Sequence, residues 1–225
     1  MKIRKIGLFG GTFNPIHYGH LRPAEEIFEA FQLDQVIFIP SADPPHKKKE
    51  GILPAPQRVE MVRLAIAGNP HFSLSPIEAN RPGKSYSVET LGHFRRDLGP
   101  QAYLYFILGF DAFREIDTWK EYTRLFELCH FIIMTRPGFE KEFSPELLPV
   151  ELAEKFCYDP KKGAYIHSSG FWIYPKEITA LDISATKIRE NLRAGLSITY
   201  LLPPAVEALI YQNKFYLSKD SEDKS

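Results

Sequence analysis

Two histidines, His17 and His20, follow the glycine pair Gly10-Gly11 near the N-terminus. Glycine lets a ligand approach the backbone closely, and the amides of such a turn can face an anion. Pro23 is tolerated only in the first turn of a helix, so a helix should begin near Gly19 and hold His20 in that turn. A helix N-terminus attracts phosphate, and an anionic ligand would favour protonated imidazoles. These residues predict a phosphate-binding site.

A second group with similar chemistry lies near the C-terminus. Ser184 is a suitable N-cap for an amphipathic helix, which would offer another helix N-terminus to phosphate oxygens. Thr186 can donate a hydroxyl, and Arg189 is a permanent cation whose fork of donors suits phosphate. The alternative is a capped surface helix with a solvated arginine.

Apolar runs alternate with amphipathic stretches along the chain. Strands that alternate with helices predict an α/β fold with a parallel sheet wound by right-handed crossovers. Ligands bind such sheets at the carboxyl ends of the strands, where Gly10-Gly11 lies. The predicted strands are 3–10, 35–40, 72–78, 103–109, 131–137 and 171–175, and the predicted helices are 20–33, 54–69, 86–99, 119–129, 184–195 and 203–216.

The length of 225 residues suits one domain, predicted over residues 1–216, with a helical C-terminal part at 184–216. The segment 138–165 reads as irregular, with one short helix near 149–156. The polar residues 217–225 predict a flexible tail.

The composition narrows the class of protein. A formal net charge of zero argues against a general binder of nucleic acid or membranes, and no apolar run approaches the ~20 residues of a membrane span. Cys129 and Cys157 lack metal-like spacing and are predicted to be buried free thiols, as in a reducing cytoplasm. A nicotinamide-dependent oxidoreductase is disfavoured, because "GGTFNP" does not match the dinucleotide fingerprint G-x-G-x-x-G. No P-loop occurs either.

The stretch "GGTFNPIHYGH" (10–20) resembles the G-x-F-x-P-x-H-x-G-H signature of the nucleotidyltransferase superfamily. "ISATKIR" (183–189) is similar to the second signature of these enzymes, I-S-x-T-x-x-R. The resemblance implies a Rossmann-like, doubly wound parallel sheet with helices on both faces and a small helical C-terminal piece. It also implies transfer of a nucleotidyl group from a nucleoside triphosphate. A non-catalytic nucleotide sensor would be expected to lose His20 or Arg189, and both are present.

Three further stretches resemble the bacterial nicotinate-nucleotide adenylyltransferases: "IPSADPPHKK", "SYSVETL" and "ILGFDAFREIDTWKEYTRL". This resemblance implies that ATP and nicotinate mononucleotide react to give deamido-NAD and pyrophosphate in NAD biosynthesis. Nicotinamide mononucleotide or phosphopantetheine remains an alternative acceptor. The sequence departs from the family at Ala185, where many relatives have a second serine, and at Phe110, which replaces a small residue.

By this resemblance, His20, His17 and Arg189 act on the ATP phosphates, and His20 contacts the transition state. The implied ATP-binding residues are Gly10, Gly11, Thr12, Phe13, His17, His20, Gly109, Asp111, Ile183, Ser184, Thr186 and Arg189. The implied nicotinate mononucleotide-binding residues are Ser41, His46, Lys47, Ser85, Tyr86, Ser87 and Trp119.

Within this acceptor site, Trp119 should stack on the nicotinate ring, and Ser85 and Ser87 should take its carboxylate. Glu89 and Asp117 are expected to point away from the ring. Mg²⁺ should arrive with ATP, because no carboxylate cluster for a protein-held ion is evident. Nucleic acid and membranes are not expected partners, and a homo-oligomer is left open.

Overall fold

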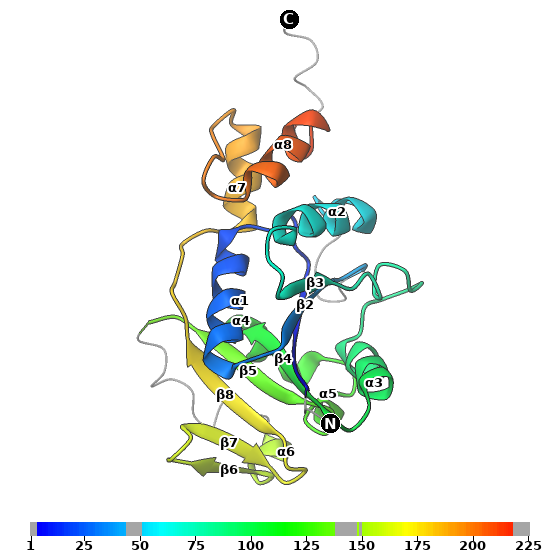
Figure 1. The fold of residues 1–225 in the computed structure, drawn as a ribbon, viewed down its shortest axis with the longest axis vertical. Coiled ribbons are helices and arrows are strands. Elements are labelled where there is room, and N and C mark those ends of the chain that lie inside the picture. Colours follow the sequence, from blue (N-terminus) through cyan, green and yellow to red (C-terminus); the bar gives the residue numbers. More distant parts are fainter. Residues whose placement is uncertain (1–3, 44–50, 138–147, 149, 218–225) are drawn as a thin grey trace, which may run out of the picture.

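The computed structural model describes residues 4–43, 51–137, 148 and 150–217 of the chain (Figure 1). Its strands form one eight-stranded sheet in the order β3-β2-β1-β4-β5-β8-β7-β6. The strands are β1 Arg4–Gly11, β2 Gln35–Pro40, β3 Phe72–Leu74, β4 Ala102–Gly109, β5 His130–Thr135, β6 Phe156–Asp159, β7 Ala164–His167 and β8 Trp172–Glu177. The central strands are almost entirely apolar, as strands covered on both faces require.

Strand order reverses at the centre of the sheet. β1 pairs in parallel with β2 on one side and with β4 on the other. Farther out, β2 pairs with β3 on the first side, and β4 pairs with β5 and β5 with β8 on the second, all in parallel. This is the doubly wound arrangement expected from the sequence. It places a topological switch point at the carboxyl ends of β1 and β4, where ligands bind in folds of this kind.

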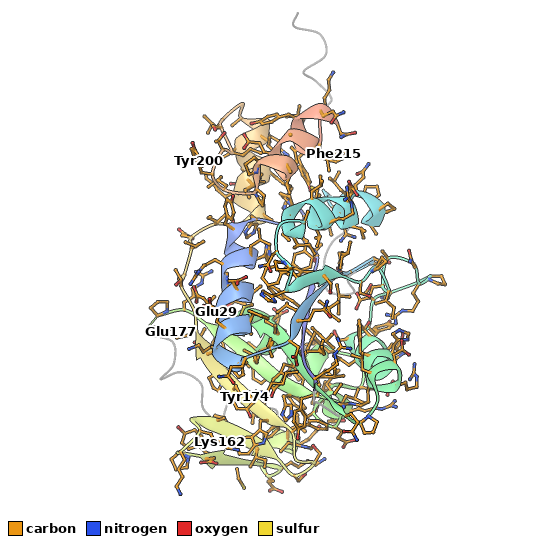
Figure 2. The ribbon with its side chains drawn as sticks, viewed as in Figure 1. Glu29, Lys162, Tyr174, Glu177, Tyr200 and Phe215 are labelled. Atoms are coloured by element: carbon orange, nitrogen blue, oxygen red, sulfur yellow. The ribbon has the colours of Figure 1, made fainter. Side chains whose placement is uncertain are left out.

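The far edge of the sheet differs from the expected purely parallel arrangement. β6 and β7 form an antiparallel hairpin, and β7 pairs antiparallel with β8. The prediction that 138–165 is irregular was therefore wrong for β6, whose four residues are too few and too exposed to show a clear alternation. In the hairpin turn Lys162 lies over the Trp172 ring, with Nζ 3.8 Å from the ring centroid (Figure 2).

Helices cover both faces of the sheet, as predicted. One buried cluster joins β-strand side chains to Val88, Leu91 and Leu125, which lie on α3 and α5. The cluster on the opposite face includes residues of α1, α2, α7 and α8. The helices are α1 Tyr18–Phe31, α2 Ala55–Ile66, α3 Ser87–Leu98, α4 Phe110–Phe113, the 3₁₀ helix η1 Ile116–Thr118, α5 Tyr122–Leu125, α6 Val150–Ala153, α7 Ala185–Arg193 and α8 Pro204–Gln212.

The single helix predicted over 119–129 does not form. Trp119 ends η1 in an extended conformation, and Glu121 has a left-handed backbone with φ of 50°, which interrupts any regular helix. α5 is therefore one short turn. The extended backbone at Trp119 places its side chain beside the sheet, where the ring packs near Phe106.

The C-terminal piece made by α7 and α8 packs against the body of the protein through shared apolar residues. Ile188 and Val206 belong to the same buried cluster as Met61 of α2. Tyr200, in the loop between the two helices, is 88% exposed (Figure 2). None of the described helices is long and apolar enough to cross a membrane. Cys129 is buried as expected, whereas Cys157 is exposed on β6 and corrects that part of the prediction.

Arg58 of α2 joins three segments at the switch point. Its side chain is buried and donates to the backbone oxygens of Leu53 (2.8 Å), Thr12 (2.6 Å) and Ala42 (3.0 Å). These carbonyls belong to the start of α2, to the loop after β1 and to the loop after β2. One guanidinium therefore fixes both loops that leave the central strands.

Replacing Arg58 by methionine should destabilise the fold, because three buried carbonyls would lose a charged donor. We expect Arg58→Met to lower the free energy of unfolding by about 3 kcal/mol, measured by urea denaturation. Arg63→Met is the matched control on the same helix, since Arg63 makes only an exposed pair with Glu60 and should cost less than about 1 kcal/mol. Equal effects of the two substitutions would contradict this role of Arg58.

Candidate active site

The two histidines lie where the helix start was predicted. His17 is the N-cap of α1, and His20 is the third residue of the helix. The His17 amide donates to Nδ1 of His20 at 3.3 Å, and the two ring centroids are 3.8 Å apart. Because Nδ1 of His20 accepts this hydrogen bond, the proton of the neutral ring is held on Nε2.

Close packing explains two of the glycines around this pair. A Cβ at Gly11 would lie 2.7 Å from the Phe13 ring. A Cβ at Gly19 would lie 2.9 Å from Nδ1 of His17 and 3.0 Å from the backbone oxygen of Ile183. Phe13 is itself buried and packs edge-on against His20, with centroids 5.2 Å apart. Its side chain therefore supports the histidine and does not line an open surface.

Burial sets the charge of His17. Its side chain is 5% exposed, and desolvation lowers its pKa to about 4. The imidazole is therefore neutral at pH 7 in the protein alone, whereas the sequence suggested that an anionic ligand would protonate it. A neutral imidazole still offers one N–H donor to a phosphate oxygen.

The second motif contacts the first, as the shared role in ATP binding implied by the resemblance would require. Ser184 caps α7 by accepting a hydrogen bond from the Lys187 amide at 3.2 Å. Arg189 donates from Nη1 to the backbone oxygen of Asn14 at 2.8 Å and from Nη2 to Thr186 Oγ1 at 3.3 Å. Nε of Arg189 is buried and has no hydrogen-bond partner among the described residues. A helix N-terminus and a partly unpaired guanidinium thus adjoin the first motif.

Asn14 connects further segments and was not singled out from the sequence. Its side chain is buried, donates to the backbone oxygen of Gly51 at 2.8 Å, and accepts from the Leu53 amide at 3.1 Å. The Tyr216 hydroxyl donates to Oδ1 of Asn14, which also accepts from Leu53, at 2.8 Å. Burial raises the pKa of Tyr216, so this hydroxyl keeps its proton. In the sequence, the available sign of a role for Asn14 was its place between Phe13 and Pro15, inside the first motif.

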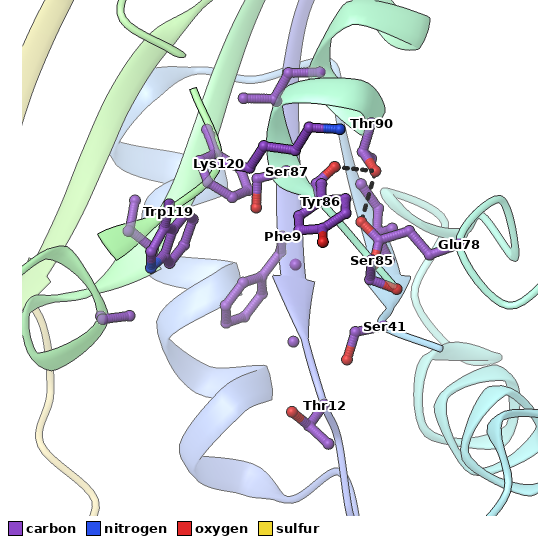
Figure 3. A pocket seen from close by; sticks show the side chains of 18 of the residues that line it. Phe9, Thr12, Ser41, Glu78, Ser85, Tyr86, Ser87, Thr90, Trp119 and Lys120 are labelled. Carbon is purple, nitrogen blue, oxygen red and sulfur yellow. Dashed lines mark hydrogen bonds between the residues drawn. The ribbon is translucent and has the colours of Figure 1, made fainter. Parts of the chain in front are cut away.

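A cavity of about 260 Å³ opens at the carboxyl ends of β1 and β4 (Figure 3). Residues 10–12 of the first motif line it, whereas His17, His20 and the second motif do not. The cavity brings together many of the predicted residues from both substrate groups. These are Gly10, Gly11, Thr12, Ser41, Ser85, Tyr86, Ser87, Gly109 and Trp119. Its other walls are apolar side chains that include Phe9, Ile39, Leu91, Phe106 and Leu108.

Known proteins resemble this chain over most of its length. Residues 8–191 match a family model described as cytidylyltransferase-like. A protein of Citrifermentans bemidjiense is 47% identical over 95% of this chain and 98% of its own, and one of Pelobacter propionicus is 49% identical over 94% and 98%. Both carry the name "Probable nicotinate-nucleotide adenylyltransferase". This chain belongs to the nicotinate-nucleotide adenylyltransferase family.

Solved structures support the fold of this adenylyltransferase. The nicotinic acid mononucleotide adenylyltransferase of Plasmodium falciparum, complexed with NaAD, aligns with a TM-score of 0.71. The alignment covers 95% of this chain and 97% of that one at 19% identity. At this identity the likeness establishes the Rossmann-like fold.

Ser85 and Ser41 both line the adenylyltransferase cavity, but they differ in whether their side chains already make hydrogen bonds. Ser85 is buried, its amide donates to the Asp43 backbone oxygen at 3.1 Å, and its Oγ accepts from the Ala42 amide at 2.9 Å. Ser85 therefore holds the loop after β2 against the start of α3. Ser41 Oγ is buried without a hydrogen-bond partner among the described residues, so it remains available to a ligand.

Other cavity residues were missed from the sequence. Glu78 is buried and accepts from Thr90 Oγ1 at 2.7 Å, and burial raises its pKa (Figure 3). Lys120 also lines the cavity and pairs with Glu89 at 2.8 Å. Glu89 and Asp117 do not line the cavity, in line with the expectation that they point away from the ring. Glu78 and Lys120 have no characteristic spacing that predicts a site, although Lys120 directly follows Trp119.

The remaining predicted residues lie outside the cavity. Asp111 is exposed and is the second residue of α4, the helix that begins directly after Gly109. Phe110 is buried in the core and supports the end of β4. His46 and Lys47 lie outside the described residues. Within the part of the chain that is described, no group of three or more histidine, cysteine or acidic side chains could hold a metal ion.

The buried neutral His17 makes stability depend on pH. Between pH 6.5 and about pH 4 the unfolded chain binds a proton at this histidine that the folded protein does not. Stability should therefore fall as the pH falls through this range, by up to about 1.4 kcal/mol per pH unit from this group. We expect urea denaturation at pH 7, 6 and 5 to show a shallower dependence for His17→Gln than for the parent. Equal slopes would contradict a neutral His17.

Proposed function

We propose that this chain transfers the adenylyl group of ATP to nicotinate mononucleotide, giving nicotinate adenine dinucleotide and pyrophosphate. The observation that carries this proposal is that two helix N-termini meet next to the loop after β1, whose residue Thr12 lines the cavity. Arg189 donates to Asn14, and Gly19 approaches Ile183, so the starts of α1 and α7 adjoin the carboxyl end of β1. Such a place suits a polyphosphate at one end and a flat acceptor ring at the other.

The chemistry needs no covalent enzyme intermediate. A phosphate oxygen of the acceptor attacks the α-phosphorus of ATP and forms a new P–O bond. The bond from that phosphorus to the bridging oxygen of the β-phosphate breaks, and pyrophosphate leaves with the electron pair. Catalysis therefore rests on positioning and on stabilising charge that develops at the α-phosphate and the leaving group.

The first motif is suited to the α-phosphate. The Nδ1 hydrogen bond from His17 leaves Nε2 of His20 as a donor, and the neutral His17 supplies a second imidazole. Gly10, Gly11 and Thr12 bring backbone close to the same place. We assign His20 to the transition-state contact.

The second motif is suited to the β- and γ-phosphates. Arg189 and the first-turn amides of α7 offer donors there, and Ser184 and Thr186 add hydroxyls. Gly109 and Asp111 follow β4, and we assign them to the adenosine side. Mg²⁺ would be carried by the phosphates of ATP and bound water.

The acceptor ring is assigned to the other end of the cavity. Trp119 offers a ring face, and Ser41, Tyr86 and Ser87 line the space beside it. Ser87 is the first residue of α3, so an anionic substituent there would meet a helix N-terminus. A cytoplasmic location belongs to the same proposal, supported by the two cysteines, which are not paired.

Loss of the His20 donor should reduce the chemical step. We expect His20→Ala to lower kcat by roughly 10²–10³, the scale of one lost transition-state donor. Turnover is measured as ATP-dependent pyrophosphate release with nicotinate mononucleotide. His71→Ala is the matched control, since His71 stacks on Phe28 at the surface, away from the cavity, and should keep turnover near that of the parent. A folded His20→Ala protein with parental turnover would contradict the assignment.

Acceptor choice tests the function as a whole. The carboxylate of nicotinate can accept hydrogen bonds from converging amides and hydroxyls, whereas the hydrogens of a carboxamide would be left unpaired at about 1–3 kcal/mol. We expect nicotinate mononucleotide to be preferred over nicotinamide mononucleotide by at least roughly tenfold in kcat/KM. Comparable values would indicate a dual-specificity enzyme. A preference for phosphopantetheine in the same assay would overturn the proposed acceptor class.

A further inference from the structure

The charges around the acceptor end of the cavity are unevenly distributed. Among the described residues that line it, Glu78 and Glu115 carry carboxyl groups, and Lys120 alone carries a positive charge. Glu78 is buried and Glu115 is exposed. Without Lys120, the ionisable side chains among these described lining residues would all be acidic.

Glu89 does not line the cavity, but it adds a further carboxylate at the start of α3, whose first residue does. It stands in the first turn of α3, two residues after Ser87, where the helix amides would attract an anionic substituent of the acceptor. A carboxylate at this position competes for the same positive end of the helix. Lys120 lies 2.8 Å from Glu89 Oε1, and Arg81 lies 3.6 Å from Oε2. The contact with Lys120 lowers the pKa of Glu89, so the pair favours the ionised carboxylate.

The Lys120 side chain spans two walls of the cavity. Its backbone follows Trp119, while its Nζ lies 4.6 Å from the centroid of the Tyr86 ring and reaches Glu89 on α3 (Figure 3). The side chain thus runs from the wall formed by Trp119 to the start of α3, and its charge lies at that second wall. The pair with Glu89 is exposed, with side chains 43% and 39% accessible, and exposed pairs of this kind stabilise a fold very little.

We propose that Lys120 is a specificity-determining residue, which makes the cavity select an acceptor ring bearing a carboxylate over one bearing a neutral carboxamide. It does so by neutralising Glu89 at the start of α3 and by adding its own positive potential there. This inference rests on the proposed function, since it concerns the substituent of the same acceptor.

The test measures kcat/KM for nicotinate and nicotinamide mononucleotides in a double-mutant cycle. Lys120→Met should lower the value for the nicotinate substrate about tenfold and change the value for the nicotinamide substrate less than about twofold. Glu89→Gln should leave the nicotinate value equal or higher. The double variant should recover about threefold relative to Lys120→Met, because the uncompensated carboxylate is gone.

Two further variants separate charge from packing. Lys120→Arg keeps the charge and should retain the preference for nicotinate mononucleotide. Arg124→Met is the matched control, because Arg124 makes a similar exposed pair with Glu121 at 3.0 Å but does not line this cavity. It should keep both kcat/KM values within about twofold of the parent.

The outcomes distinguish this inference from the proposed function. If the parent prefers nicotinate mononucleotide and Lys120→Met changes both acceptors equally, or changes neither, the function stands and the role of Lys120 is wrong. If the parent shows no preference, both the acceptor assignment and the role of Lys120 are wrong. A preference that falls in Lys120→Met and partly returns with Glu89→Gln supports the proposal.

Discussion

The hydrogen bond from Arg189 to the backbone oxygen of Asn14 is the contact on which the site depends. It joins two residues that are 175 positions apart in the chain, one in each motif, and sets the starts of α1 and α7 beside one another. Each helix start alone attracts an anion only weakly, but two that converge can divide a chain of phosphates between them. The close approach of Gly19 to Ile183 has the same consequence, because a side chain at that glycine would separate the motifs.

Around this contact, the fold uses buried polar side chains to hold loops that regular structure does not reach. Arg58 fixes the loops after β1 and β2, and Asn14 ties the first motif to Gly51, Leu53 and Tyr216. Backbone carbonyls at the ends of strands must be paired when they are buried, and side chains from elsewhere supply the donors. The rigidity of the phosphate site is therefore a product of hydrogen bonds to the backbone as much as of apolar packing.

The pattern of apolar residues was sufficient to predict the central sheet and most of the helices, because these follow from local periodicity. The start of α1 near His20 was also correct, although Pro23 is the sixth residue of the helix and lies beyond the first turn in which the prediction placed it. Two parts were not predictable in this way. The hairpin of β6 and β7 consists of four-residue strands with partly exposed faces, and the segment around Trp119 is broken by the left-handed backbone of Glu121. Arg58, Asn14 and Glu78 were missed for a different reason. Their partners Thr12, Leu53 and Thr90 are backbone or hydroxyl groups 12 to 46 residues away, so local spacing does not predict these contacts, even though Asn14 lies inside the first motif.

The neutral state of His17 also decides where the positive potential of the site arises. Burial lowers its pKa to about 4, so a proton on this ring contributes little at pH 7 in the protein alone. The permanent contributions are the Arg189 guanidinium, which cannot lose its proton, and the amides at the starts of α1 and α7. Neither changes with pH in the physiological range. Among the described residues of this candidate site, attraction for phosphate would therefore come mainly from backbone amides and the Arg189 guanidinium, and the proposed role of the two histidines is that of directed hydrogen-bond donors.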